Sequence, residues 1–211
     1  MTLFITFEGG EGCGKSTQAR ALYRKLSQLA IPVILTHEPG GTSLGNKLSR
    51  WLKWAEGTDI SPLTELMLFN ASRSQLITEV IRPNLNEGKI VICDRYADST
   101  TVYQSYGRGL DLEMVKAVNN AATQGLKPNL TILLDISAEE GLARQRGKKQ
   151  DRFEQEELAF HQRVREGFLK LAQQEPQRWL VVAATQPKEK IARTIWQRVS
   201  QSISEQGLKH E

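Results

Sequence analysis

Cysteine and long hydrophobic runs are both scarce in this sequence, and each shortage excludes a class of protein. Only two cysteines occur, Cys13 and Cys93, with no CxxC pair and no histidine partners at ligand spacing. Neither a disulfide framework nor a zinc site is therefore expected. No window approaches the roughly 18 apolar residues that would span a bilayer, and no basic segment precedes an apolar stretch at the N-terminus. We expect reduced thiols, a cytoplasmic protein and no contact with a membrane.

The excess of one sign of charge over the other is small as well. The chain has 28 basic and 24 acidic side chains, a net charge of +4, and no lysine and arginine block of roughly five or more. A nucleic-acid binder predicts a concentrated basic face, so no nucleic-acid partner is expected. A mild basic excess does suit an anionic ligand. The densest basic cluster comprises Arg144, Arg146, Lys148 and Lys149.

Short apolar runs predict the strands, which fall at residues 3–7, 33–36, 90–93, 130–134 and 180–182. Stretches with helical spacing separate them, so strands and helices alternate. Strands that are apolar at nearly every position predict an α/β fold, a five-stranded parallel sheet with helices on both faces and ligands at its carboxyl edge. No linker or repeat divides the chain, so a single domain over residues 1–211 is expected.

The predicted helices have recognisable ends and apolar stripes. Ser61 and Pro62 fit an N-cap followed by proline in the first turn, and Gly57 and Gly88 stand where helices should stop. The stripes are expected to face the core and not a cofactor. They comprise Leu22, Leu26, Leu29, Leu63, Leu66, Phe69, Leu76, Val80, Ile191, Ile195 and Val199.

Residues 9–16, GGEGCGKS, match the pattern G-x-x-x-x-G-K-[ST] between a predicted strand and a predicted helix. Glycines let consecutive backbone N–H groups surround phosphate oxygens, and the helix N-terminus adds positive charge. Lys15 would reach the β and γ phosphates, and the Ser16 hydroxyl would ligate Mg²⁺. The loop is predicted to hold a nucleoside triphosphate through Gly9, Gly10, Glu11, Gly12, Cys13, Gly14, Lys15, Ser16 and Thr17.

Asp94 follows the buried run 90–93, where a magnesium-linked carboxylate belongs in such folds. The metal ligands predicted are therefore Ser16 and Asp94. A plain ion pair between Asp94 and Arg95 at the sheet edge is an alternative that the sequence leaves open.

Further segments stand beside the phosphate loop. They are EPGGT at 38–42, FNASR at 69–73, DRYADSTTVYQ at 94–104, GRG at 107–109, DRFE at 151–154 and ATQP at 184–187. In this order and at these separations the chain resembles the bacterial thymidylate kinases from residue 3 to about 187. The segment 94–104 is the most specific part, because many ATPases and GTPases share the phosphate loop. The resemblance implies a P-loop NTPase fold, a mobile lid at about 141–153 and a homodimer packed through helices.

The resemblance also implies an activity, the Mg²⁺-dependent transfer of the γ phosphate of ATP to dTMP. Phe69 would stack on thymine, and Arg73 would donate to its O4, which rejects cytosine because an amino group stands there. Tyr103 would pack beneath the sugar at C2′, and Glu11 would reach the 3′-hydroxyl. A core role for Phe69 and an exposed loop position for Glu11 are the alternatives. The substrate-binding residues predicted are Glu11, Glu38, Pro39, Phe69, Arg73, Arg95, Ser99, Thr100, Tyr103 and Gln104.

The cations predicted to handle the phosphates come from two places. Arg95 resembles the family's clamp on the acceptor phosphate, for which a planar guanidinium is suited. Family members carry an arginine for the transferring phosphoryl group either in the phosphate loop or in the lid, and Gly12 in the loop fits the second kind. The alternative is that the basic residues of the lid are only a solvated helix end. The catalytic residues predicted are Lys15, Asp94, Arg95, Arg144 and Arg146.

Two positions depart from the family pattern. Ser49 stands where the family usually has arginine, and Arg50 follows it, turned by roughly 100° on a helix. Either Arg50 swings into the site or the acceptor phosphate loses a ligand. Ala183 stands where Asp is frequent, in the loop expected to border adenine.

Other functions and other mechanisms are disfavoured. A GTP-dependent switch should carry Asn-Lys-x-Asp, which does not occur. Phe69, Arg73 and Tyr103 argue against other nucleoside monophosphate kinases. A phosphate monoester with a second pKa of about 6 is largely ionised at neutral pH and needs no general base. The histidines are accordingly predicted to be structural or solvent-facing.

Overall fold

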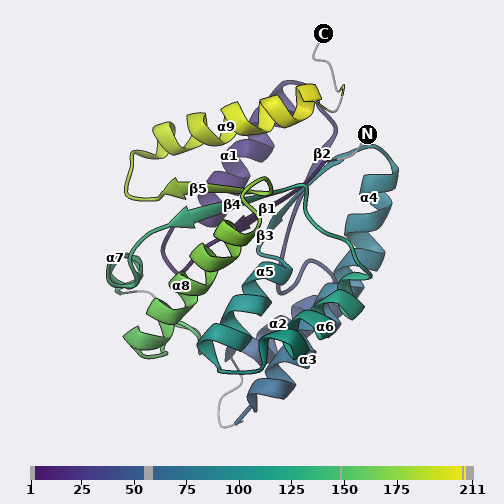
Figure 1. Cartoon of the computed structure of the whole chain (residues 1–211). Helices are drawn as coiled ribbons and strands as arrows, with labels where there is room; N and C mark the ends of the chain where they lie inside the picture. Colours follow the sequence, from purple (N-terminus) through teal and green to yellow (C-terminus); the bar gives the residue numbers. More distant parts are fainter. Residues whose placement is uncertain (1–2, 55–58, 148, 206, 208–211) are drawn as a thin grey trace.

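A single parallel sheet forms the centre of the computed structural model, which describes residues 3–54, 59–147, 149–205 and 207. Its strands run in the order β2-β3-β1-β4-β5 (Figure 1). They are β1 (Phe4–Glu8), β2 (Val33–His37), β3 (Ile90–Asp94), β4 (Leu130–Asp135) and β5 (Trp179–Ala183). Each predicted strand is present and ends one residue later than predicted, so the predicted five-stranded parallel sheet is confirmed.

The register of the sheet brings the predicted site segments to one edge. Phe7 of β1 and His37 of β2 both pair with Asp94 of β3. The loops that follow these three strands therefore leave the sheet together. They carry the phosphate loop, Glu38 and Arg95, as expected for ligand sites at the carboxyl ends of parallel strands.

Helices cover both faces of the sheet (Figure 1). One face carries α1 (Lys15–Gln28) and α9 (Lys188–Glu205). The other face carries α8 (Leu158–Gln174) and a long helix. That helix consists of α3 (Pro62–Leu76), the π-helical η1 (Ile77–Ile81) and α4 (Arg82–Asn86).

Shorter elements complete the side that holds α3. Helices α2 (Ser43–Trp54) and α6 (Leu112–Thr123) pack against α3. Helix α5 (Ala97–Thr100) follows β3 and continues into the π-helical η2 (Thr101–Gly107). Helix α7 (Ala138–Ala143) follows β4.

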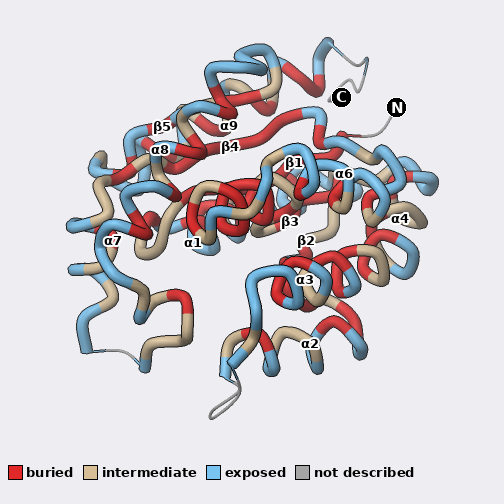
Figure 2. The backbone as a smooth tube through the Cα atoms, turned by 60° about the horizontal axis from the view of Figure 1, so that its bottom comes forward, coloured by how far each residue is buried: buried red, intermediate tan, exposed pale blue. Residues whose placement is uncertain are grey.

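Alternation along the strands divides the core. Ile5 and Phe7 face α1 and α9, whereas Phe4 and Cys93 pack with η1 and α4. Leu133 belongs to a third cluster with α8 and η2. Figure 2 shows the consequence, a buried central sheet beneath helices whose outer surfaces are exposed.

The predicted helix ends are largely confirmed. The Ser61 hydroxyl accepts a hydrogen bond from the Thr64 N–H at 3.3 Å, and proline is the first residue of α3. Gly88 has φ +80° and donates its N–H to the Leu85 carbonyl at 3.0 Å just after α4. Gly57 lies outside the described residues.

Two residues of the predicted core stripes are exposed. Leu29 follows the end of α1 and is 40% exposed, and Leu63 in the first turn of α3 is 45% exposed. Their assignment to the core was wrong, because residues at helix ends are not covered by the neighbouring layer. Buried as predicted are Leu22, Leu26, Leu66, Leu76, Ile191, Ile195 and Val199. No described helix has the combination of length and apolarity that a membrane span requires.

Candidate active site

The phosphate loop connects β1 to α1 and closes over its own lysine. Lys15 is 7% exposed, and its Nζ donates to the carbonyls of Gly9 at 2.9 Å and Gly10 at 2.6 Å. Gly14, with φ +93°, caps α1, so the positive end of the helix faces the same space. A cavity of about 920 Å³ opens there, and its wall includes Glu11, Gly12, Cys13, Gly14, Lys15, Ser16 and Thr17. We call it the donor cavity.

Position 12 of the loop has no room for a side chain. A Cβ on Gly12 would lie 2.1 Å from the carbonyl oxygen of Gly141 in α7, and the φ of +66° further disfavours other residues. The loop is therefore pressed against the element that begins the predicted lid. An arginine cannot stand at this position, so any additional cation must come from another element.

The two predicted metal ligands meet at the mouth of the donor cavity. The Ser16 hydroxyl donates to Asp94 Oδ2. Arg95 pairs with Glu11 and not with Asp94, so the alternative of a plain Asp94–Arg95 ion pair is wrong. No described group of three or more His, Cys, Asp or Glu side chains could hold a metal. A hydroxyl and a carboxylate fit Mg²⁺, which uses few protein ligands together with phosphate and water oxygens.

Glu11 and Arg95 form a pair at the bottom of the site. Arg95 Nη2 lies 2.6 Å from Glu11 Oε1, to which the Tyr103 hydroxyl also donates at 2.7 Å. Burial raises the pKa of Glu11, but Arg95 and then Lys15 outweigh it and hold the pKa at about 2. Glu11 is thus ionised at neutral pH and partly buried, so its alternative as an exposed loop carboxylate is wrong.

A second acidic side chain, the buried Glu8, was missed from the sequence. It accepts the Tyr96 N–H at 2.8 Å and the Ser99 hydroxyl at 2.5 Å, and Ser99 in turn accepts from Arg95 Nη1 at 3.1 Å. Burial and then Asp98 raise the pKa of Glu8 to about 8. Arg95 itself has φ +70°, a conformation costly for a residue with a side chain. Glu8 therefore secures the turn that aims Arg95 at the site.

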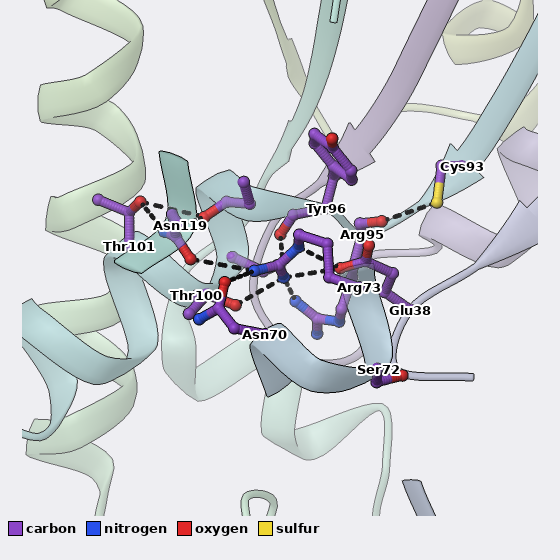
Figure 3. A network of polar contacts seen from close by, with 12 residues as sticks. Glu38, Asn70, Ser72, Arg73, Cys93, Arg95, Tyr96, Thr100, Thr101 and Asn119 are labelled. Carbon is purple, nitrogen blue, oxygen red and sulfur yellow. Dashed lines mark hydrogen bonds and ion pairs between the residues drawn. The ribbon is translucent and has the colours of Figure 1, made fainter. Parts of the chain in front are cut away.

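Arg73 is the centre of a buried network on the acceptor side (Figure 3). It is 1% exposed, and all five of its N–H groups have partners within the described residues. The acceptors are Glu38 Oε2, Asn70 Oδ1, Asn119 Oδ1, Thr100 Oγ1 and the Tyr96 carbonyl, at 2.7 to 3.3 Å. The guanidinium is held in place before any ligand arrives. Its predicted bond to a base requires one of these partners to be exchanged.

A smaller cavity, of about 70 Å³, lies beside this network, and we call it the acceptor cavity. Gln104 is fully buried in its wall, with Nε2 donating to Glu65 at 2.8 Å and Oε1 without a partner in the described part of the chain. The Phe69 ring faces Phe153, with centroids 5.6 Å apart. Every predicted substrate-binding residue lines this cavity, namely Glu11, Glu38, Pro39, Phe69, Arg73, Arg95, Ser99, Thr100, Tyr103 and Gln104.

Glu65 was also missed from the sequence. Glu65 is 0% exposed and accepts from Arg108 Nε at 3.1 Å and Arg152 Nη2 at 2.5 Å, besides Gln104. Its carboxylate thus joins α3, η2 and the end of the predicted lid. Glu65 looks like one more polar residue in a helix, and only the fold brings two arginines to it.

Known proteins match this chain over nearly all of its length. The family model described as "Thymidylate kinase" matches residues 7–195. The thymidylate kinase of Dehalococcoides mccartyi strain CBDB1 is 58% identical over 200 residues, which covers 95% of this chain and 96% of that protein. The chain belongs to the thymidylate kinase family. The resemblance read from the sequence is thereby confirmed.

More distant thymidylate kinases agree with this membership. That of Roseiflexus castenholzii strain DSM 13941 / HLO8 is 50% identical over 209 residues, covering 92% of this chain and 91% of that protein. The crystal structure of thymidylate kinase from Ehrlichia chaffeensis superposes with a TM-score of 0.78 at 32% identity, covering 94% of this chain and 98% of that one. The fold is that of the thymidylate kinases, a P-loop NTPase fold.

The basic residues of the predicted lid point in different directions. Arg144 lines the donor cavity, with Nη1 donating to the Ala184 carbonyl at 3.2 Å. Arg146 is exposed and lies outside the wall of that cavity. Arg152 is turned toward Glu65, on the acceptor side. Lys148 lies outside the described residues. The predicted pair Arg144 and Arg146 is thus not brought together.

The departures from the thymidylate kinase pattern are visible in the structure. Ser49 lines the donor cavity, whereas Arg50 is exposed and lines neither cavity. Arg50 therefore does not swing into the site. Ala183 is exposed, and the next residue, Ala184, lines the donor cavity.

The described histidines contact neither an acid nor a nucleophile through their rings. His161 is buried against Phe160, and burial lowers its pKa. His37 is exposed at the wall of the donor cavity. His210 lies outside the described residues.

Proposed function

We propose that the chain transfers the γ phosphate of ATP to dTMP, giving ADP and dTDP for dTTP synthesis. The observation that carries this proposal is the junction of the donor and acceptor cavities, which share Glu11 and Arg95 in their walls. Two phosphorylated ligands, one in each cavity, would meet end to end at a guanidinium. Membership in the thymidylate kinase family supports the same substrates.

ATP would occupy the donor cavity with its triphosphate on the loop. Lys15 would turn from the carbonyls of Gly9 and Gly10 to the β and γ phosphates, where the N-terminus of α1 adds positive charge. Mg²⁺, held by Ser16 and Asp94, would neutralise phosphate charge when bound. The Ala184 side of the cavity would border adenine.

Thymine would be recognised by the acceptor cavity. Its face would lie on Phe69, and its N3–H would donate to Gln104 Oε1, a buried acceptor without a partner among the described residues. Arg73 would exchange its bond to Thr100 for one to O4. Cytosine has an acceptor at N3 and an amino group at C4, so both contacts would be repulsive or unpaired, which rejects this base strongly.

The sugar and phosphate of dTMP would point toward the junction. Tyr103 would lie beneath C2′ and leave no room for a ribose hydroxyl, and the ionised Glu11 would accept the 3′-hydroxyl proton in a hydrogen bond. Arg95 would grip the phosphate in bidentate fashion. Ser99 would hold Arg95 in that orientation.

The transfer needs positioning and charge compensation more than proton movement. An ionised oxygen of the dTMP phosphate attacks the γ phosphorus, the bond to the β–γ bridging oxygen breaks, and ADP leaves. Lys15 and Arg95 hold the two anions in line. Arg144 is the lid residue best placed to add charge, and Arg146 would reach the phosphates only after the lid moves.

The proposal is tested by acceptor-dependent ADP release with ATP and Mg²⁺. The acceptors to compare are dTMP, dUMP, ribothymidine monophosphate, dCMP, dGMP and AMP. We expect a strong preference for dTMP, with the ribose and cytosine analogues rejected. Equal rates for all acceptors, or ADP release without any, would contradict the proposal and favour an ATPase or a nucleotide switch.

We further propose that the chain is a single domain with a mobile lid, forms a homodimer and is cytoplasmic. Large apolar side chains are exposed on the three neighbouring helices α2, α3 and α6, which suits a helical interface. They are Leu44, Trp51, Leu63, Met67 and Met114. Both cysteines are free, which suits a reducing compartment. Sedimentation equilibrium should give twice the mass of the chain, and a monomer would contradict the dimer.

A further inference from the structure

The junction of the two cavities has a second cation besides Arg95. The residues that line both cavities are Glu11, Glu38, Pro39, Lys53 and Arg95. Arg95 and Lys53 are the basic members of this set. Lys53 lies in the last turn of α2, outside both the phosphate loop and the segment 94–104.

Lys53 has fewer and longer polar contacts than Arg95. Arg95 lies 2.6 Å from Glu11 and also donates to the Gly9 carbonyl at 3.0 Å. The Lys53 ammonium lies 3.6 Å from Asp151 Oδ2, longer than a hydrogen bond, and its side chain is 37% exposed. Such an exposed pair contributes little, so a stronger anion can replace Asp151.

The backbone at Lys53 is fixed although its ammonium is loosely held. The Lys53 carbonyl accepts the Arg152 N–H, and the Leu52 carbonyl accepts Arg152 Nε, both at 3.2 Å. Lys149 Nζ lies 5.0 Å from the Trp54 ring centroid. The last turn of α2 is thus attached to the segment after α7. The base of the side chain is placed, and its end can turn.

The face of α2 that Lys53 occupies is the face toward the ligands. Ser49 is four residues earlier, so both residues lie on one side of the helix, and both line the donor cavity. Arg50, three residues before Lys53, is exposed and lines neither cavity. A cation from α2 can therefore reach the junction from position 53, and Ser49 has no charge to offer there.

The charges at the junction require such a cation. Glu11 already opposes Arg95, and Glu38 opposes Arg73, so these two guanidiniums are matched by carboxylates. A phosphate monoester adds a charge of about −1.5 to −2. Among the described residues that line both cavities, Lys53 is the basic residue without a carboxylate at hydrogen-bond distance, since Asp151 Oδ2 lies 3.6 Å from its ammonium.

We propose that Lys53 is a ligand of the acceptor's phosphate. This inference rests on the proposed function and names a further residue of its substrate site. When dTMP enters, the Lys53 ammonium leaves Asp151 and donates to phosphate oxygens on the side opposite Arg95. An ammonium carries three donors on a flexible stem, so it follows the phosphate as the two ligands approach each other.

Calorimetric binding of dTMP and of thymidine, which has no phosphate, tests the assignment. In Lys53→Met, the dTMP affinity should fall about tenfold to a hundredfold, because a charge-assisted hydrogen bond is lost. Thymidine affinity should not change. Lys53→Arg should retain most of the dTMP affinity. The matched control is Arg50→Met, a cation on the same helix outside both cavities, which should bind both ligands as the wild type does.

Asp151 provides a second arm of the test. Asp151→Asn removes the competing charge but keeps the Oδ1 acceptor that binds the N–H groups of Phe153 and Glu154. It should raise dTMP affinity in the wild-type background and not in Lys53→Met. A purely structural role for Lys53 predicts no such difference between the two backgrounds.

Two results would overturn the assignment. One is an unchanged dTMP affinity in Lys53→Met, and the other is an equal loss of affinity for dTMP and thymidine. Failure of the proposed function would be seen separately, because the wild-type chain itself would then neither bind dTMP nor phosphorylate it.

Discussion

The donor cavity takes much of its wall from one continuous stretch, residues 11–20, whereas the acceptor cavity is lined by side chains from the ends of strands and from several helices. On the donor side the fixed groups are backbone N–H groups and a helix N-terminus. On the acceptor side they are buried ion pairs around Arg73 and Glu65. Substitutions on the donor side should therefore affect catalysis, and those on the acceptor side should affect folding as well.

The largest expected effect is on the donor side. Lys15→Met should lower kcat at least about a hundredfold, because charge on the γ phosphate loses its compensation. Its dTMP affinity should stay near that of the wild type, because Lys15 does not line the acceptor cavity. Steady-state kinetics and calorimetry measure the two quantities. The control is Lys47→Met, an exposed lysine of α2. Equal losses of kcat and dTMP affinity would remove the distinction between the two sides.

The largest effect on stability is expected on the acceptor side. Arg73→Met leaves the Glu38 carboxylate and two asparagine oxygens without their donor in a buried place. The free energy of unfolding should fall by about 3–5 kcal/mol, measured by urea denaturation. Arg24→Met, at an exposed position of α1, should change it by less than about 0.5 kcal/mol. A similarly small change for Arg73→Met would show that the network contributes little to the fold.

The two arginines of the predicted lid, Arg144 and Arg146, should also differ in their effect on catalysis. Arg144 lines the donor cavity, and Arg146 does not. Arg144→Met should therefore reduce kcat several-fold more than Arg146→Met, with urea midpoints unchanged in both. The kcat values of the two variants, measured at saturating ATP and dTMP, provide the comparison. A larger loss for Arg146→Met would mean that closure rearranges the lid beyond the geometry described above.

The last prediction concerns Glu8 and pH, where the stability lost in each pH unit is smaller than the loss expected in Arg73→Met. Its folded pKa of about 8 lies above the ordinary value of 4.5, so the folded state keeps a proton that the unfolded chain releases between these values. Stability must then fall as pH rises through this window, by up to about 1.4 kcal/mol per pH unit. Glu8→Gln has no such proton and should lose less stability. Urea unfolding at pH 5, 6.5 and 8 measures the difference, and parallel pH profiles would contradict the raised pKa.

The sequence was informative where the structure is local. Strands, the cap at Ser61 and the phosphate loop depend on neighbouring residues, and each was found where predicted. Glu8 and Lys53 could not be predicted, since a carboxylate at a strand end and a lysine on a helix have no distinctive spacing. Their surroundings arise from elements about 90 to 100 residues away.

The π-helical turns show the same limit. The apolar spacing predicted a helix through Val80, but nothing in it indicated the wider turn η1. In η2, Tyr103 and Gln104 were identified only through the resemblance to a family, and their orientation depends on the wider turn that carries them. The prediction that Leu29 and Leu63 lie in the core was wrong, because helical spacing does not show where the neighbouring layer of the fold ends.

We expect the two cavities to pass a phosphoryl group between two nucleotides at their junction. The most direct test follows the label of ATP carrying a radioactive γ phosphate, with and without dTMP. Label should appear in dTDP when dTMP is present, and little inorganic phosphate should form in its absence. Label released as inorganic phosphate at the same rate with and without dTMP would contradict this expectation.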